Sequence, residues 1–149
     1  MKKSLVLSVS AGIGCYRHIQ IGEDETLFKL HETILDSVAF FDDHLHAFFM
    51  DNQAWSSDAE YICPGGDGKT AKGYSNKAAL SKFHLQKGDK FIYVFDFGDD
   101  WRFQIKVLRV VDEPTKAPVV LKSVGQISQY GYDEESWDEE NDGFSDFEP

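Results

Sequence analysis

The stretch Phe91–Val111, FIYVFDFGDDWRFQIKVLRVV, decides the fold of this 149-residue chain. Every second residue of its first half is aromatic, and in its second half apolar residues alternate with Arg, Gln and Lys. Because successive side chains of a strand point to opposite faces, this pattern predicts two strands of a sheet with one buried face. Gly98 and Asp99, between the strands, tolerate the positive φ of a tight hairpin turn. The first strand is apolar on both faces and is therefore expected inside the sheet, while the second has one wet face.

Shorter stretches are expected to extend this sheet. Residues 4–10 and 16–21 read as strands joined by a glycine-containing turn, so they are predicted to pair antiparallel. Residues 44–50 read as a further strand, and residues 118–121 could add a short edge strand, where a proline is tolerated. Residues 51–74 contain four glycines and are expected to form a loop.

One main helix is expected between the second and third strands. Thr26 is a suitable N-cap, and the helix is predicted to end at residues 42–43. Its apolar residues recur at spacings of three and four and form the stripe Leu27, Leu30, Ile34, Val38 and Phe41. Ser75 is expected to cap a short helix that reaches Phe83. The order strand, strand, helix, strand, short helix, strand, strand predicts an α+β fold: a mixed sheet of about five strands with the main helix on one face.

The charge of the chain is concentrated near its C-terminal end. The chain carries 15 basic and 26 acidic residues, a net charge of −11. Nine of the acids lie in residues 133–149, and no basic residue follows Lys122. Without this segment, 17 acids face 15 bases, a net charge of −2. We therefore predict a single α+β domain over residues 1–132 and an acidic, disordered tail over residues 133–149.

The cysteines and the N-terminal residues give information about the cellular location of the protein. Cys15 and Cys63 have no metal-binding or redox spacing and are typical of free thiols in a reducing cytoplasm. Residues 1–15 share features with a short lipoprotein signal, but the alternation within them is that of a strand. No stretch is long enough to span a membrane. We expect a cytoplasmic protein without a membrane partner.

Three histidines and two aspartates are the candidate catalytic or metal-binding residues. His44 and His46 are expected on the same face of their strand, and His31 at the edge of the helical stripe. With Asp96 they could bind zinc or another transition metal if the fold brings them together. Asp96 or Asp99 could act as a general base. The alternative, which we favour, is that the histidines pack or form hydrogen bonds, that the aspartates stabilise the turn, and that no cofactor is bound.

A lysine-rich segment is the candidate binding surface. Between residues 68 and 88 there are five lysines and no acid: Lys69, Lys72, Lys77, Lys82 and Lys87. Such a segment could contact the phosphates of a nucleic acid, and the acidic tail could cover it and compete with that partner. Trp101 is a further binding candidate, although it is more readily explained as a core or rim anchor. The alternative is a solvated helix and a tail that only improves solubility.

Three short motifs also carry a family resemblance, which extends over about residues 4–125. They are Leu27-x-x-Leu30-His31-Glu32, His44-Leu45-His46-x-Phe48 and Tyr93-x-x-Asp96-Phe97-Gly98-Asp99-x-Trp101. In this order they resemble the plasmid Ri ORF-three-like family, whose members include passenger proteins of bacterial insertion elements. The resemblance implies a small α+β fold and no settled activity, so it assigns no catalytic residue.

Together these observations favour a non-enzymatic interaction module of plasmid or mobile-element origin with an unidentified protein partner. Two alternatives stay open: a metal-dependent enzyme that uses the histidines and Asp96, and a weak nucleic-acid binder that uses the lysine segment. Bound metal would favour the first alternative, and salt-sensitive binding to DNA or RNA would favour the second.

Overall fold

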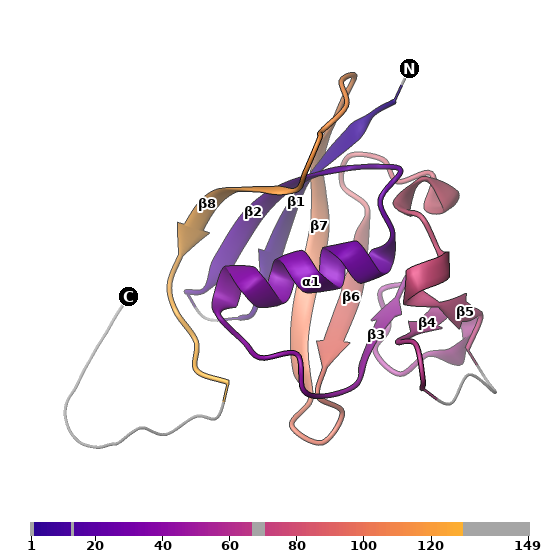
Figure 1. The fold of residues 1–149 in the computed structure, drawn as a ribbon, viewed down its shortest axis with the longest axis vertical. Helices are drawn as coiled ribbons and strands as arrows, with labels where there is room; N and C mark the ends of the chain where they lie inside the picture. Colours follow the sequence, from indigo (N-terminus) through magenta and orange to yellow (C-terminus); the bar gives the residue numbers. More distant parts are fainter. Residues whose placement is uncertain (1, 13, 67–70, 130–149) are drawn as a thin grey trace.

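The computed structural model describes residues 2–12, 14–66 and 71–129, which form an eight-stranded sheet with one α-helix across one of its faces (Figure 1). The α+β class is as predicted, but the sheet has eight strands rather than about five. In chain order the elements are β1 (Ser4–Ser10), β2 (Tyr16–Gly22), α1 (Leu27–Val38), β3 (His46–Phe49), η1 (Ser57–Ala59), β4 (Glu60–Ile62), β5 (Gly73–Tyr74), η2 (Ser75–Lys77), η3 (Leu80–Phe83), β6 (Lys90–Phe95), β7 (Trp101–Val111) and β8 (Val119–Val124).

The strands lie in the order β5-β4-β3-β6-β7-β1-β2-β8. Neighbouring strands are antiparallel except for β4 and β5, which are parallel. β6 therefore lies inside the sheet between β3 and β7, as its two apolar faces predict. β4 and β5 arise within residues 51–74, where a loop was expected, because strands of three and two residues are too short to show an alternating pattern.

α1 begins as predicted but ends earlier. The hydroxyl of Thr26 accepts a hydrogen bond from the backbone N–H three residues later, as an N-cap does. The helix stops at Val38 because Ala39 adopts a left-handed conformation with φ of 60°. Phe40 then turns back into the core, while Phe41, expected in the buried stripe, is 74% exposed.

The main core lies between α1 and the sheet. It contains the inward-facing residues of the central strands and the apolar stripe of α1, including Leu7, Ile19, Leu30, Ile34, Phe48, Phe91, Tyr93, Phe95, Phe103 and Ile105. A smaller cluster lies on the opposite face of β3 and β6 and contains Ala47, Phe49, Ile62, Cys63 and Val94. One face of the sheet is thus buried along most strands, and the second cluster lies on the other face, at its β3–β4 end.

A buried arginine ties the C-terminal end of α1 to the sheet. Arg17, on β2, donates a hydrogen bond from Nε to the carbonyl oxygen of Ser37, at 2.8 Å, and one from Nη1 to that of Val124, at 2.9 Å. A cation at the carbonyl end of a helix is stabilised by the unpaired carbonyl groups there. Arg17 therefore connects α1, β2 and the edge strand β8.

Two further expectations are corrected by the structure. Residues 75–83 form the separate 3₁₀ turns η2 and η3 instead of one short helix, because the Ser75 side chain is buried and does not cap a helix. At the corner between β6 and β7, the positive φ angles belong to Asp96 and Asp100, at 64° and 56°, and not to Gly98 and Asp99. None of the described helices is long and apolar enough to cross a membrane. The predicted acidic tail, residues 133–149, lies outside the described residues.

Replacing a core aromatic residue should strongly destabilise this fold. Phe103 is 1% exposed and packs under α1, so we expect Phe103→Ala to lower the free energy of unfolding by about 3–5 kcal/mol. The matched control, Phe41→Ala, should change it by less than about 0.5 kcal/mol because that ring is largely in water. Urea denaturation followed by circular dichroism measures both, and equal destabilisation by the two variants would contradict the placement of these rings.

Candidate functional site

A cluster of polar side chains is buried between α1 and the sheet. His31 from α1 and His46 from β3 stack with their ring centroids 3.7 Å apart. His31 Nδ1 lies 2.6 Å from the hydroxyl of Tyr93, and its Nε2 lies 2.8 Å from Oδ2 of Asp42. His46 Nε2 lies 2.8 Å from the hydroxyl of Ser75. We call these five residues the histidine cluster; only Asp42 among them reaches solvent.

Burial keeps both imidazoles uncharged. It lowers the pKa of His31, although the hydrogen bond and the charge of Asp42 partly oppose this effect. Burial, together with the neighbouring His31, lowers the pKa of His46 to about 2. Burial also raises the pKa of the Tyr93 phenol well above its usual value.

These protonation states assign the direction of the hydrogen bonds. The ionised carboxylate of Asp42 can only accept, so the proton of neutral His31 is on Nε2. Nδ1 of His31 is then an acceptor, and the Tyr93 hydroxyl donates to it. The result is a chain of donors and acceptors from the surface at Asp42 to the centre of the sheet, in which each polar group has a partner.

The structure separates His44 from the other two candidate metal ligands, His31 and His46, which stack on each other. β3 begins at His46, so His44 lies outside the strand. The expectation that His44 and His46 share one face of a strand is therefore wrong. Nε2 of His44 lies instead 3.4 Å from Oδ2 of Asp96, and its side chain is 40% exposed. Both ring nitrogens of His31 and one of His46 already have hydrogen-bond partners in the protein. In the part of the chain that the structure describes, no three His, Cys, Asp or Glu side chains are grouped so that they could hold a metal ion.

Asp96 forms hydrogen bonds that hold the corner between β6 and β7. Its backbone N–H donates to the carbonyl of Leu45 at 2.8 Å, and its own carbonyl accepts from the N–H of Asp100 at 2.6 Å. Its carboxylate accepts from the N–H of Asp99 at 3.3 Å. These are the contacts of a residue that stabilises a turn, and the side chain of Asp99 points into solvent beside it.

Trp101 packs at the rim of the main core. Its ring meets that of Phe40 edge to face, with centroids 5.1 Å apart, and contacts the residues under α1. Its Nε1 is buried and has no hydrogen-bond partner among the described residues. Most of the ring surface is therefore used for packing rather than presented to a ligand.

The lysine segment is spread over several elements. Lys72 precedes β5, Lys77 ends η2, Lys82 lies in η3 and Lys87 lies in the turn before β6. All four are exposed, but they do not line one face of a helix. Lys69 lies outside the described residues.

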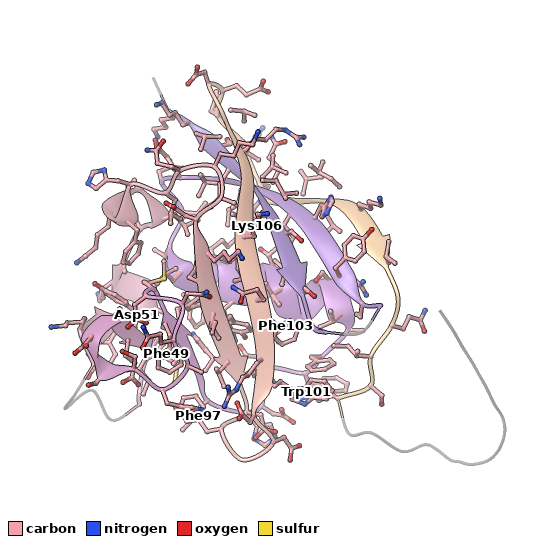
Figure 2. The ribbon with its side chains drawn as sticks, turned by 180° about the vertical axis from the view of Figure 1, so that it is seen from behind. Phe49, Asp51, Phe97, Trp101, Phe103 and Lys106 are labelled. Atoms are coloured by element: carbon pink, nitrogen blue, oxygen red, sulfur yellow. The ribbon has the colours of Figure 1, made fainter. Side chains whose placement is uncertain are left out.

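A row of polar side chains, three of them lysines, crosses the face of the sheet opposite α1, which we call the rear face; Figure 2 labels one of these lysines, Lys106. Five residues are paired across five adjacent strands and form what we call the basic row: Lys90 on β6, Lys106 on β7, Ser8 on β1, His18 on β2 and Lys122 on β8. The three lysines are exposed, and none of these five strands contains an aspartate or a glutamate. Sequence reasoning missed the row because its members are far apart in the chain; the only trace was the wet face of β7.

An aromatic patch lies on the same rear face, at its β3 end (Figure 2). The ring of Trp55 meets Phe49 and Phe97 edge to face, with centroid distances of 5.5 and 5.1 Å. We call these three residues the Trp55 patch. The loop that carries Trp55 is joined to β7, since Oδ1 of Asn52 accepts a hydrogen bond from Nε2 of Gln104 at 2.7 Å. The rear face thus combines exposed cations with an exposed indole.

These features define a small α+β domain whose single described helix covers one face of the sheet. The model of the plasmid pRiA4b ORF-3-like protein family matches residues 9–133, and the chain belongs to this family. The family resemblance of the three motifs is thereby confirmed. A solved structure of a protein of unknown function, MM3350 from Methanosarcina mazei Go1, is similar with a TM-score of 0.65 and 27% identity, over 83% of this chain and 70% of that chain. No curated protein matches the chain.

The buried histidines predict a dependence of stability on pH. In the folded protein His46 stays neutral down to about pH 2, whereas in the unfolded chain it binds a proton below its ordinary pKa of 6.5. The free energy of unfolding should therefore fall as the pH is lowered from 6.5 to 4, by about 1.4 kcal/mol per pH unit for this residue. The depressed pKa of His31 acts in the same direction. Urea denaturation at a series of pH values measures the slope.

A matched pair of variants assigns this slope to the cluster. His46→Asn should lose about one histidine's share of it, while His84→Asn, at an exposed position, should keep it. The same slope in wild type and His46→Asn would contradict the assignment.

Proposed function

We propose that this protein is a non-enzymatic interaction module of plasmid or mobile-element origin that binds nucleic acid through the basic row. The observation that carries the proposal is the cross-strand row on the rear face, in which exposed Lys90 pairs with exposed Lys106 and exposed Lys122 pairs with His18. Membership of a family named after a plasmid reading frame supports the proposed origin. Buried, free Cys15 and Cys63 agree with a cytoplasmic location, where such a partner would be met.

The arrangement of these charges is unfavourable for the isolated domain. Lys90 and Lys106 stand directly opposite each other on adjacent strands, where side chains are about 5 Å apart and like charges repel. No carboxylate on the same strands compensates them. Phosphates of a nucleic acid would neutralise the row, and the release of counterions would add to the affinity.

The histidine cluster supports a structural role rather than catalysis. Its imidazoles are buried, and both ring nitrogens of His31 and Nε2 of His46 are hydrogen-bonded to protein partners. Two surface pockets of about 290 and 310 Å³ lie among the described residues, and neither is lined by His31, His46 or Asp96. His31 and His46, two of the groups that a metal-dependent enzyme would use, are buried, so this alternative has less support than binding.

Neutralising the basic row should weaken binding to nucleic acid. We expect Lys90→Gln/Lys106→Gln/Lys122→Gln to lower the affinity for a fluorescent 20-nucleotide strand about tenfold or more at low salt. The slope of log affinity against log salt should become less steep by about two to three, because each lost phosphate contact reduces it by roughly 0.7–0.9. Fluorescence anisotropy across a salt series measures both quantities.

The matched control carries the same change of charge elsewhere on the surface. Lys72→Gln/Lys77→Gln/Lys82→Gln removes three lysines of the segment first considered for phosphate contacts, and should leave the affinity nearly unchanged. Loss of binding in this control, with the basic-row variant intact, would move the site to the lysine segment. Equal affinities of wild type and both variants would refute a lysine-based site.

The acidic residues 133–149 are expected to compete with the nucleic acid. These residues carry nine acids and no base, opposite in sign to the basic row. Replacing the nine acids by their amides should raise the affinity at low salt by at least severalfold, and the difference should shrink as salt screens the charges. Unchanged affinity at low salt would show that this segment does not compete.

A further inference from the structure

The loop after β3 has an unusual backbone for the residues it contains. Asn52 and Trp55 adopt left-handed conformations, with φ of 61° and 67°. Asparagine tolerates this region, whereas a bulky side chain such as tryptophan is a true outlier there. Such strain persists only where the surrounding structure enforces it, and it is frequent at functional sites.

Hydrogen bonds hold this loop in place. One carboxylate oxygen of Asp51 accepts from the hydroxyl of Ser56 at 2.6 Å, and the other accepts from the backbone N–H of Gln53 at 3.2 Å. The side chain of Asn52 accepts from Gln104 on β7 at 2.7 Å. These hydrogen bonds therefore fix the conformation of the loop and, with it, the position of Trp55.

The loop places the indole at the surface rather than in the core. Trp55 is 45% exposed, while Phe49 beneath it is completely buried. The ring is supported by edge-to-face contacts with Phe49 and Phe97, so it is oriented. An aliphatic side chain would cover Phe49 equally well, so covering Phe49 does not by itself account for a tryptophan at this position.

We propose that Trp55 is a stacking platform for an unpaired base, so that the partner of the rear face is a single-stranded nucleic acid. This inference rests on the proposed function of the basic row. Strands are about 4.8 Å apart, and two strand spacings separate Phe49 on β3 from Gln104 on β7, which is two residues from Lys106. One strand of nucleic acid can therefore place phosphates on the basic row and a base on the indole.

Single-stranded partners are bound through this combination of a positive surface and exposed aromatic rings. In a duplex, the bases are stacked inside and cannot reach the ring, so a duplex would use the lysines alone. DNA and RNA share the required chemistry, and the experiment distinguishes them.

The test compares ligands with and without bases. Fluorescence anisotropy is measured with labelled 12-nucleotide single strands of DNA and of RNA, with the corresponding duplex, and with an abasic sugar–phosphate strand of the same length. We expect Trp55→Leu to weaken binding of the single strands about tenfold, in keeping with the loss of one base–aromatic stack. Binding of the duplex and of the abasic strand should not change. Whichever of DNA and RNA loses more affinity is the ligand that stacks on Trp55.

Two controls separate a lost stack from a damaged loop. Trp55→Phe keeps an aromatic face and should retain most of the affinity, and urea denaturation should show that both variants fold as the wild type does. Equal single-strand affinities of wild type and Trp55→Leu, with binding lost in the basic-row variant, would overturn this inference and leave the proposed function standing. Absence of binding to every ligand at low salt would overturn both.

Discussion

A single helix can cover only one face of this sheet, and most of the structure follows from that constraint. α1 has 12 residues, about 18 Å of helix, against eight strands. The core accordingly forms on one side, where the aromatic residues of β3, β6 and β7 face the helix. The other face is covered partly by loops and is otherwise exposed to water. Polar and basic side chains therefore occupy the rear of β7, β1 and β2.

The histidine cluster shows how polar groups can remain beneath that helix. Burying an imidazole or a phenol is costly unless its polar atoms have partners. Here His31 receives a hydrogen bond from Tyr93 and donates one to Asp42, whose carboxylate is half in water. The charge thus stays at the surface while its hydrogen bond extends inward, and α1, β6 and the segment after α1 are held in one register.

The rear face has an aromatic part and a basic part. At its β3 end, a braced loop covers Phe49 and leaves the indole of Trp55 exposed, and across its middle lysines from separate strands are brought together. The nine acids of residues 133–149 account for most of the net charge of −11, so the overall charge conceals a local positive surface. Net charge alone would therefore have argued against a nucleic-acid partner.

Much of the fold could be predicted because its signals are local. Alternation over Phe91–Val111 predicted β6 and β7, and Thr26 with its apolar stripe predicted α1. The short strands β4 and β5 could not be predicted, since two or three residues hold no period. The end of α1 was also missed, because the left-handed turn at Ala39 is made by a residue that normally continues a helix.

The candidate sites show the same difference between features with a local sequence signal and features without one. The sequence by itself determined the α+β class and the family, and it singled out three histidines as candidate site residues. It could do so because propensity, alternation and motif spacing are properties of neighbouring residues. Only the tertiary structure decided that His31 and His46 stack while His44 stands apart, and that Lys90, Lys106 and Lys122 form one row. The physical reason is that cross-strand register and helix docking set which distant side chains meet, and no local pattern encodes those distances.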